Sequence, residues 1–132
     1  MHVFSLRTTE RDQIVDITPQ VAGLVRQSGM QSCLAVVYVP HTTAGVAINE
    51  NADPDVKRDI LMLLNELIPW THPKYRHIEG NSASHLKAVI TGSSQTIIVE
   101  NGRLQLGRWQ GIYFCEFDGP RDRKFYVKLI AG

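Results

Sequence analysis

The sequence predicts an α+β fold, in which a mainly antiparallel β-sheet or sandwich packs against two to three helices. Three observations predict it: strand-like runs of β-branched and apolar residues, amphipathic helical segments between them, and a C-terminal third that is β in character. The 132 residues contain no repeat and no linker rich in proline, glycine or serine. We therefore expect one domain that spans residues 1–132.

The N-terminal part of the chain is predicted to contain two strands, a short helix and a buried strand. Residues 3–9 and 13–17 are strand-like around a polar turn, so an antiparallel pair is expected. Thr18, followed by proline, is predicted to cap a helix that Gly29 ends. Residues 32–39 are almost continuously apolar, which indicates a strand that is buried on both faces and central in its sheet.

Two amphipathic segments follow. Residues 54–67 carry apolar side chains at helical spacing, with Asp53 as the expected N-cap. Residues 82–91 form a second such segment, with Ser82 as the expected cap and Gly92 as the stop. Both segments are therefore predicted to be helices.

The remaining residues favour strands. The dipeptide Asn101-Gly102 supplies the positive φ angles of a two-residue turn, so a hairpin is expected there. Aromatic and β-branched residues continue through 109–117 and 124–130, on either side of a turn. The C-terminal third is accordingly predicted to be an antiparallel meander.

Composition argues against several classes of protein. The formal net charge is only +1, and the 14 basic residues are scattered apart from a short cluster at Arg121, Arg123 and Lys124, so we do not expect nucleic-acid binding. The longest apolar run, residues 34–39, is far below the ~20 residues of a membrane span, and the N-terminus does not resemble a signal peptide. We therefore expect a soluble, cytoplasmic protein without a membrane partner.

Three histidines lie where functional groups are often held. His41 follows the predicted buried strand, and His77 and His85 flank the start of the last predicted helix. Neutral imidazole is a good ligand for zinc and related divalent ions, and three histidines can leave a fourth position open for water or substrate. Their spacing is unlike the compact patterns that identify a metal site alone. The alternative is that each imidazole caps a strand or helix by a hydrogen bond to the backbone.

Carboxylates near these histidines are candidates for proton transfer. Glu50 or Glu79 would act as a general base if burial raised its pKa, and the alternative for each is a solvated loop carboxylate. Asp53 is first of all a helix cap, because the helix that follows it needs an acceptor for its free N–H groups.

An anion pocket is a further expectation. Arg121 follows a turn that could present its guanidinium to a phosphate, and Gly80 and Asn81 precede a helix N-terminus, where anions are favoured. Trp109 and Gln110 could line the same pocket. The alternatives are a surface salt bridge for Arg121, an ordinary turn at Gly80 and a core position for Trp109.

Five sequence blocks stand out along the chain. They are HTTAG at 41–45, NENADP at 49–54, EGN at 79–81 with HLK at 85–87, LGRWQ at 106–110 and EFDGPR at 116–121. Taken in order, these blocks resemble the YjbQ-like family, and they span nearly the whole chain. Arg108 departs from the family pattern, because relatives usually have threonine at that position.

The resemblance implies a small α+β domain that assembles as a homotrimer, with a cleft of clustered histidines and acids. It implies a divalent ion in that cleft, zinc or magnesium, and a phosphorylated small molecule as the ligand. The implied activity is that of a weak thiamine-phosphate synthase, which joins an aminopyrimidine pyrophosphate to a thiazole phosphate with loss of pyrophosphate. A non-catalytic protein that binds a metal or a phosphate metabolite is the alternative.

Residue chemistry and the resemblance together give each candidate residue an expected role. The metal ligands would be His41, His77 and His85. The catalytic residues would be Glu50, Glu79 and Arg121. The substrate-binding residues would be Asn49, Gly80, Asn81, Trp109 and Gln110.

Overall fold

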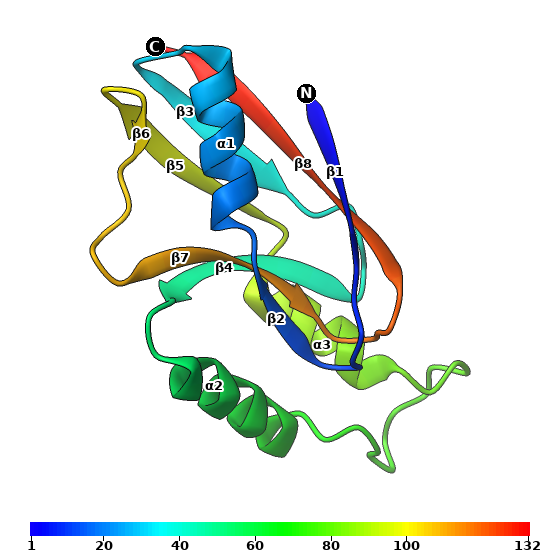
Figure 1. Ribbon diagram of the computed structural model, residues 1–132. Coiled ribbons are helices and arrows are strands. Elements are labelled where there is room, and N and C mark those ends of the chain that lie inside the picture. The colour runs from blue at the N-terminus through cyan, green and yellow to red at the C-terminus, as the bar shows by residue number, and fades with distance from the viewer.

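Two antiparallel sheets and three helices make up the structure, a computed structural model that describes every residue from Met1 to Gly132 (Figure 1). The strands are β1 (His2–Arg7), β2 (Gln13–Asp16), β3 (Cys33–Tyr38), β4 (Ala44–Glu50), β5 (Ser94–Glu100), β6 (Arg103–Leu104), β7 (Gln110–Glu116) and β8 (Asp122–Ala131). The helices are α1 (Thr18–Ser28), α2 (Pro54–Leu67) and α3 (Ser82–Thr91). The predicted α+β fold is confirmed.

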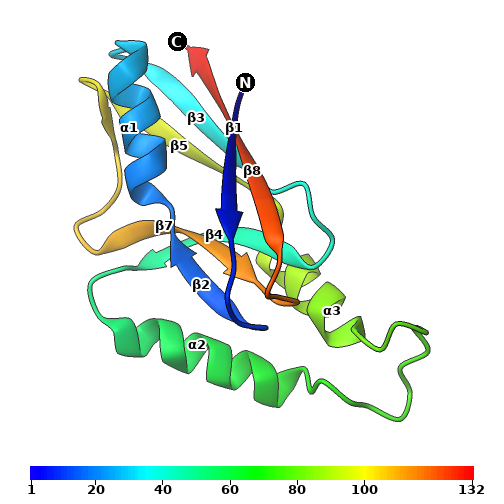
Figure 2. The ribbon, with the colours of Figure 1, turned by 45° about the vertical axis from the view of Figure 1, so that its right-hand side comes forward.

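The two sheets share one main hydrophobic core. The larger sheet has the strand order β1-β8-β3-β5-β6, and the smaller has the order β2-β7-β4. β4 and β7 run across one end of the larger sheet, and α1 stands beside them (Figure 2). Both sheets and α1 contribute to the core, with Val21, Val37 and Phe114 among its fully buried side chains. This packing brings the β3–β4 and β7–β8 loops to the same end of the molecule.

β3 is the central strand of the larger sheet, as predicted, but only one of its faces is buried. Cys33, Ala35 and Val37 point into the core. Leu34 and Tyr38, which alternate with them, are 41% and 45% exposed. The prediction of two buried faces is therefore wrong for the single chain, because apolar side chains also stand on the outer face of the sheet.

Two predicted strand pairings are wrong. β1 pairs with β8 in the larger sheet and β2 with β7 in the smaller, so the N-terminal strands do not pair with each other. Asn101 and Gly102 form the predicted hairpin turn, with φ angles of 53° and 71°, but β7 then joins the smaller sheet instead of continuing a meander. The local pattern identifies each strand, whereas burial against distant segments selects its partner.

The helix caps agree with the sequence in part. The Oδ1 atom of Asp53 accepts the N–H of Asp55 at 2.9 Å, which confirms the predicted cap of α2. The N-cap of α1 is Ile17 instead of Thr18, because the Ile17 carbonyl accepts the first helical N–H, that of Val21, and the Thr18 hydroxyl accepts the N–H of Ile112 in β7 at 2.8 Å. Thr18 therefore ties α1 to the smaller sheet.

α2 is the least buried of the helices, since none of its residues is fully buried. Leu61 and Leu64 pack against a second, smaller apolar cluster that includes Tyr113, Cys115 and Phe117. Burial raises the pKa of the Cys115 thiol to about 12, so this thiol stays protonated at neutral pH. None of the three helices combines the length and the apolar character needed to cross a membrane.

Candidate functional site

A pocket of about 390 Å³ lies where the β3–β4 and β7–β8 loops meet the start of α3. Apart from one proline, every residue that lines it is polar or charged, and we call it the polar pocket. Its lining residues are Pro40, His41, Thr42, Thr43, His77, Glu79, Asn81, His85, Asp118, Arg121 and Arg123. Three imidazoles and two guanidinium groups therefore gather in a space large enough for a small molecule.

The polar pocket brings together much of the site that the sequence predicts. All three candidate histidines line it, and so do the candidates Glu79, Asn81 and Arg121. Gly80 lies between Glu79 and Asn81 and turns the chain into α3 with a φ of 75°, a conformation that favours glycine. These residues come from three loops and one helix that are far apart in the sequence.

The other four candidates lie at the opposite end of the smaller sheet. Asn49 and Glu50 close β4, Gln110 opens β7 directly opposite Glu50, and Trp109 lies in the turn just before β7. The polar pocket begins at the other end of the same pair, where Ala44 lies opposite Glu116. Six residues of extended strand correspond to roughly 20 Å.

The side chains at this far end make local contacts. The Glu50 carboxylate accepts the N–H of Ala52 at 3.2 Å, and the Gln110 amide oxygen accepts the N–H of Gly107 at 2.8 Å. Trp109 is 55% exposed and is not a core residue. The guanidinium carbon of Arg108, the residue that departs from the family pattern, stands 4.7 Å from the centre of a Trp109 ring.

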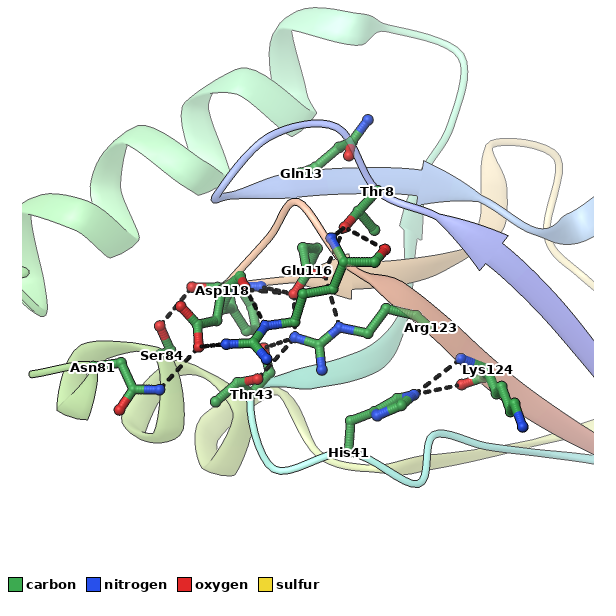
Figure 3. Close-up of polar contacts among 12 residues, drawn as sticks. Thr8, Gln13, His41, Thr43, Asn81, Ser84, Glu116, Asp118, Arg123 and Lys124 are labelled. Carbon is green, nitrogen blue, oxygen red and sulfur yellow. Dashed lines mark hydrogen bonds and ion pairs between the residues drawn. The ribbon is translucent and has the colours of Figure 1, made fainter. Parts of the chain in front are cut away.

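The His41 side chain continues the hydrogen bonding between β3 and β8 past the end of β3. If the β3–β8 register is continued past the end of β3, Pro40 falls opposite Lys124, and proline has no N–H to offer. The Nε2 atom of His41 instead lies 2.9 Å from the N atom and 3.1 Å from the O atom of Lys124 (Figure 3). The ring accepts from the N–H or donates to the carbonyl according to its tautomer. Backbone capping, the alternative role for a histidine, is thus what His41 performs in the chain.

Burial lowers the pKa of His41, and the nearby positive charge of Arg123 lowers it further. The imidazole is therefore neutral at neutral pH. A neutral ring keeps one nitrogen free of a proton, which is the form that binds a metal or takes up a proton.

A buried ion pair forms one wall of the polar pocket. Arg123 is 5% exposed and Glu116 is fully buried. The Nε atom of Arg123 donates to one carboxylate oxygen of Glu116 at 2.8 Å, and its Nη2 atom donates to the other oxygen and to the Thr43 hydroxyl. The Thr8 hydroxyl also donates to Glu116, at 2.7 Å. The pair holds the ends of β1, β7 and β8 and the β3–β4 loop together.

Glu116 stays ionised in spite of its burial. Burial by itself raises the pKa of this carboxyl, but hydrogen bonds from Arg123, Thr8 and the N–H of Asp118 lower it by more, so the resulting pKa lies below its ordinary value. The wall of the polar pocket therefore carries a fixed salt bridge, in which the charge of Arg123 is largely balanced.

Asp118 organises the opposite side of the pocket. Its Oδ2 atom accepts the Nδ2–H of Asn81 at 2.9 Å and the Nη2–H of Arg121 at 2.8 Å. Arg121 therefore forms the surface salt bridge that was the alternative for it, and it still lines the pocket. The Oδ1 atom of Asn81 is buried and has no hydrogen-bond partner, and in Figure 3 it points away from Asp118.

Asn81 places the start of α3 at the rim of the polar pocket. Asn81, and not Ser82 as predicted, is its N-cap, and the Asn81 side chain makes no capping hydrogen bond. The N–H groups of Ser82 and Ala83 have no acceptor within the chain. The hydroxyl of Ser84 donates to the carbonyl of Phe117 at 2.6 Å and so anchors this end of α3 to the end of β7. A helix start of this kind attracts anions.

His77 and His85 form an edge-to-face pair beside the helix start. Their ring centroids are 5.2 Å apart and their planes are at 89°. Two imidazoles that share one tetrahedral ion through bonds of ~2.1 Å have centroids roughly 5 Å apart, so the separation of this pair matches that of two ligands of one ion as well as that of an edge-to-face ring contact. No three His, Cys, Asp or Glu side chains of the chain stand in an arrangement that could hold one. The third candidate, His41, has its Nε2 atom engaged by Lys124.

Sequence reasoning missed the residues that build the walls of the pocket. The sequence places Arg123 only in a basic cluster, and it marks Glu116 and Asp118 as polar candidates near Arg121 without assigning either a role. The strand period contains the missing signal, because Arg123 falls on the same face of β8 as the buried Phe125 and Val127. A charge on the inner face of a strand requires a buried partner.

Comparison with known proteins covers the chain from end to end. The family model described as "UPF0047 protein YjbQ-like" matches residues 2–132. The UPF0047 protein YugU of Bacillus subtilis is 54% identical over 131 residues, which cover 99% of each chain. A UPF0047 protein of Methanocaldococcus jannaschii is 52% identical over 130 residues, covering 97% of this chain and 92% of its own length.

Solved structures agree with the sequence comparison. A crystal structure of an uncharacterised protein of this family from Clostridium acetobutylicum superposes with a TM-score of 0.96 at 58% identity, covering 98% of this chain and 100% of that one. A hypothetical protein from Aeropyrum pernix superposes with a TM-score of 0.94 at 40% identity, covering 99% and 98%. With both the sequence blocks and the fold matched over its whole length, the chain belongs to the YjbQ-like family, UPF0047.

Proposed function

We propose that the polar pocket binds a phosphorylated small molecule and that the protein is a transferase of the thiamine-phosphate synthase type. The single observation that carries the proposal is the gathering of three imidazoles and two guanidinium groups in one pocket without apolar side chains other than a proline. Arg121 and Arg123 are each paired with a carboxylate, so an anion would be bound by their remaining N–H groups and by the imidazoles, and the pocket offers little to an apolar ligand. The reaction type comes from the family resemblance.

The proposed reaction transfers an aminopyrimidine methyl group. The bond between its methylene carbon and the pyrophosphate oxygen breaks, and the pyrophosphate leaves with the electron pair. The thiazole nitrogen uses its lone pair to form the new bond to the same carbon. Atoms and charge balance without an oxidant or a further reactant, so the protein has to orient two anionic molecules and stabilise the departing pyrophosphate.

Different residues of the polar pocket would bind the pyrophosphate, donate hydrogen bonds to it as it leaves, and bind the pyrimidine. The outer edge of the Arg121 guanidinium would hold the pyrophosphate, together with the free N–H of Ser82 beside the pocket at the start of α3. An N–H of the His77 or His85 imidazole would donate to its oxygens as charge develops there. Glu79, which is exposed at the rim, would accept a hydrogen bond from the amino group of the pyrimidine.

A divalent ion is part of the proposal. His77 and His85 would hold it, and His41 would have to move toward them to join as the third ligand through its Nδ1 atom, because the three do not stand together as a ligand set in the chain. Nitrogen donors suit zinc better than magnesium, which prefers oxygen. When bound, the ion would add positive charge beside the phosphate groups.

The homotrimer implied by the family resemblance is proposed as well. The outer face of the larger sheet supports an association between chains, because Ile98, Leu34 and Ile130 stand side by side on β5, β3 and β8 and are 41% to 55% exposed. Light scattering on the purified protein tests it, and the trimer predicts three times the chain mass of 14.8 kDa. A mass of one or two chains would contradict it.

The experiment for the activity uses untagged protein from cells that lack a dedicated thiamine-phosphate synthase. We expect thiamine phosphate and pyrophosphate in equal amounts from the two substrates. His77→Asn and His85→Asn should each lower the rate at least tenfold, because both imidazoles face the proposed leaving group. His2→Asn is the matched control, because His2 is exposed on β1 and lies outside the polar pocket.

Calorimetry with each substrate accompanies the assay. Saturable binding that depends on His77 and His85 without any product would reject the transferase and leave the non-catalytic metabolite-binding protein. Absence of binding would reject the proposed function altogether.

A further inference from the structure

A cavity of about 200 Å³ lies between α2 and the smaller sheet, and we call it the apolar cavity. Figure 1 and Figure 2 both show α2 running beneath the strands of this sheet. Nine of the eleven lining residues are hydrophobic, and none is charged. The lining residues are Ile14, Ala47, Ile48, Asn49, Ile60, Leu61, Leu64, Thr91, Tyr113, Cys115 and Phe117. None of them lines the polar pocket, so the two spaces are separate.

The floor of the apolar cavity consists of two aromatic rings and a sulfur atom. Tyr113, Cys115 and Phe117 alternate along β7 and just past its end, so their side chains stand on one face. All three are almost completely buried. Aromatic rings attract a further ring in an edge-to-face or offset stacked arrangement, and sulfur makes favourable contacts with ring edges. This floor therefore suits an aromatic ligand.

α2 forms the opposite wall of the cavity. Ile60, Leu61 and Leu64 line it, and each is only half-buried. The position of the helix is fixed next to Leu64, because the Nζ atom of Lys87 in α3 donates to the Oδ1 atom of Asn65 at 2.5 Å. Lys87 is 1% exposed, so a shift of α2 toward the sheet would disturb a buried charged hydrogen bond. The cavity is therefore held open by the fold.

The size and lining of the cavity match one small ring. Apolar cavities of roughly 150 Å³ in other proteins stay dry and bind benzene. Water needs several polar partners in such a space, and the lining offers only Asn49 and Thr91. Asn49 is the one exposed residue of the lining, which places the mouth of the cavity beside the end of β4.

We propose that the apolar cavity is a binding site for a small, uncharged aromatic molecule. Tyr113, Cys115 and Phe117 contact the ring from one side, and Ile60 and Leu64 contact it from the other. The ligand buries the half-exposed inner face of α2 and so holds this helix on the sheet. The site goes beyond the proposed function, because the polar pocket takes charged molecules and has no lining residue in common with the cavity.

The test uses benzene as the probe, with ¹H–¹³C methyl spectra of the full chain. We expect saturable shifts at the methyl groups of Ile14, Ala47 and Leu64, and none at Leu34 on the outer face of the larger sheet. Benzoate carries the same ring with a carboxylate, and it should leave these signals unchanged because the cavity offers its charge no partner. The urea midpoint should rise with benzene concentration, since benzene binds only the folded chain.

Ala47→Leu is the decisive variant, because the larger side chain takes up the space of the ring. It should abolish the saturable shifts. The matched control is Ala22→Leu, which changes a half-buried alanine of α1 outside the cavity and should bind benzene like the unchanged protein. Leu64→Ala is a second variant, independent of how well Ala47→Leu folds. It enlarges the cavity and should bind naphthalene more tightly than the unchanged protein does.

Several outcomes would overturn the site. Absence of saturable shifts, equal shifts at Leu34, or unchanged benzene binding in Ala47→Leu would each show that benzene does not enter the cavity. Equal binding of benzoate would overturn the uncharged class of ligand. Methyl signals of the cavity that change with protein concentration would assign the space to a side chain of a second copy. None of these results bears on the proposed function, which is tested with the substrates of the polar pocket.

Discussion

The two ends of the β4–β7 pair differ in whether their charged side chains are buried or exposed. At the end where Ala44 lies opposite Glu116, a buried carboxylate and a buried guanidinium meet at the wall of the polar pocket. At the end where Glu50 lies opposite Gln110, polar side chains bind nearby backbone groups at the surface. Successive sequence blocks are thus divided between two environments by the length of one strand.

This difference teaches where substitutions should matter. A buried charge that loses its partner has no water to replace it, whereas an exposed side chain exchanges one hydrogen bond for another with the solvent. The pocket end should therefore be sensitive to single changes and the far end tolerant of them.

The largest effect is expected for Arg123→Met, which leaves Glu116 buried without its counter-charge. The free energy of unfolding should fall by about 3–5 kcal/mol, measured by urea denaturation. The double variant Arg123→Met with Glu116→Leu should recover much of this loss, because no charge is then buried alone. A loss below about 1 kcal/mol in the single variant would show that the pocket end is no more sensitive to substitution than the far end.

A smaller loss is expected for Thr8→Val. The Thr8 hydroxyl donates to Glu116 and accepts the N–H of Arg121 at 2.9 Å. Its removal therefore leaves the buried Glu116 carboxylate and the partly buried Arg121 N–H each with one hydrogen bond fewer. We expect a loss of about 1–3 kcal/mol in the same measurement. An unchanged urea midpoint would mean that the Thr8 hydroxyl does not contribute to stability and that Arg123 alone stabilises the buried Glu116.

The pH dependence of stability gives a third test at the pocket end. Burial, and then Arg123, lower the pKa of His41 in the folded chain below its ordinary value of 6.5. The unfolded chain therefore takes up the proton more readily, and the contribution to stability is complete above pH 6.5 and is lost as the pH falls through the folded pKa. His41→Asn should remove this part of the decline between pH 7.5 and 5. Parallel pH profiles of the two proteins would contradict the assignment.

The smallest effect is expected for Glu50→Gln at the far end. The side chain accepts only the N–H of Ala52, and the hydroxyl of Tyr113 donates to the backbone carbonyl of Glu50, which the substitution retains. The free energy of unfolding should change by no more than about 0.5 kcal/mol. A change above about 1 kcal/mol would mean that the far end carries a strained or coupled carboxylate.

Local features of the fold were predictable from the sequence because their causes are local. Asp53 caps α2, and Asn101 and Gly102 form the hairpin turn, since neighbouring backbone atoms alone decide both. The outer face of β3 was not predictable in the same way. Leu34 is apolar and exposed, and nothing within its own segment distinguishes it from the buried Val37.

The site was predictable to the extent that its residues sit at strand and helix ends. The position of His41 after β3 and of Asn81 before α3 followed from element boundaries alone. That Glu50 and His41 would lie at opposite ends of one strand pair required the register of β4 on β7. That Arg123 faces Glu116 required the alternation of β8 to be combined with that of β7.

The contacts that close the polar pocket join the two ends of the chain. Thr8 and Arg121 are 113 residues apart, and His41 and Lys124 are 83 apart. Contacts between such distant residues form late, because a long loop must first be closed at an entropic cost. We expect the pocket to be absent from the nascent chain until β8 has been synthesised, and to be among the last parts of the molecule to become protected from amide hydrogen exchange during folding.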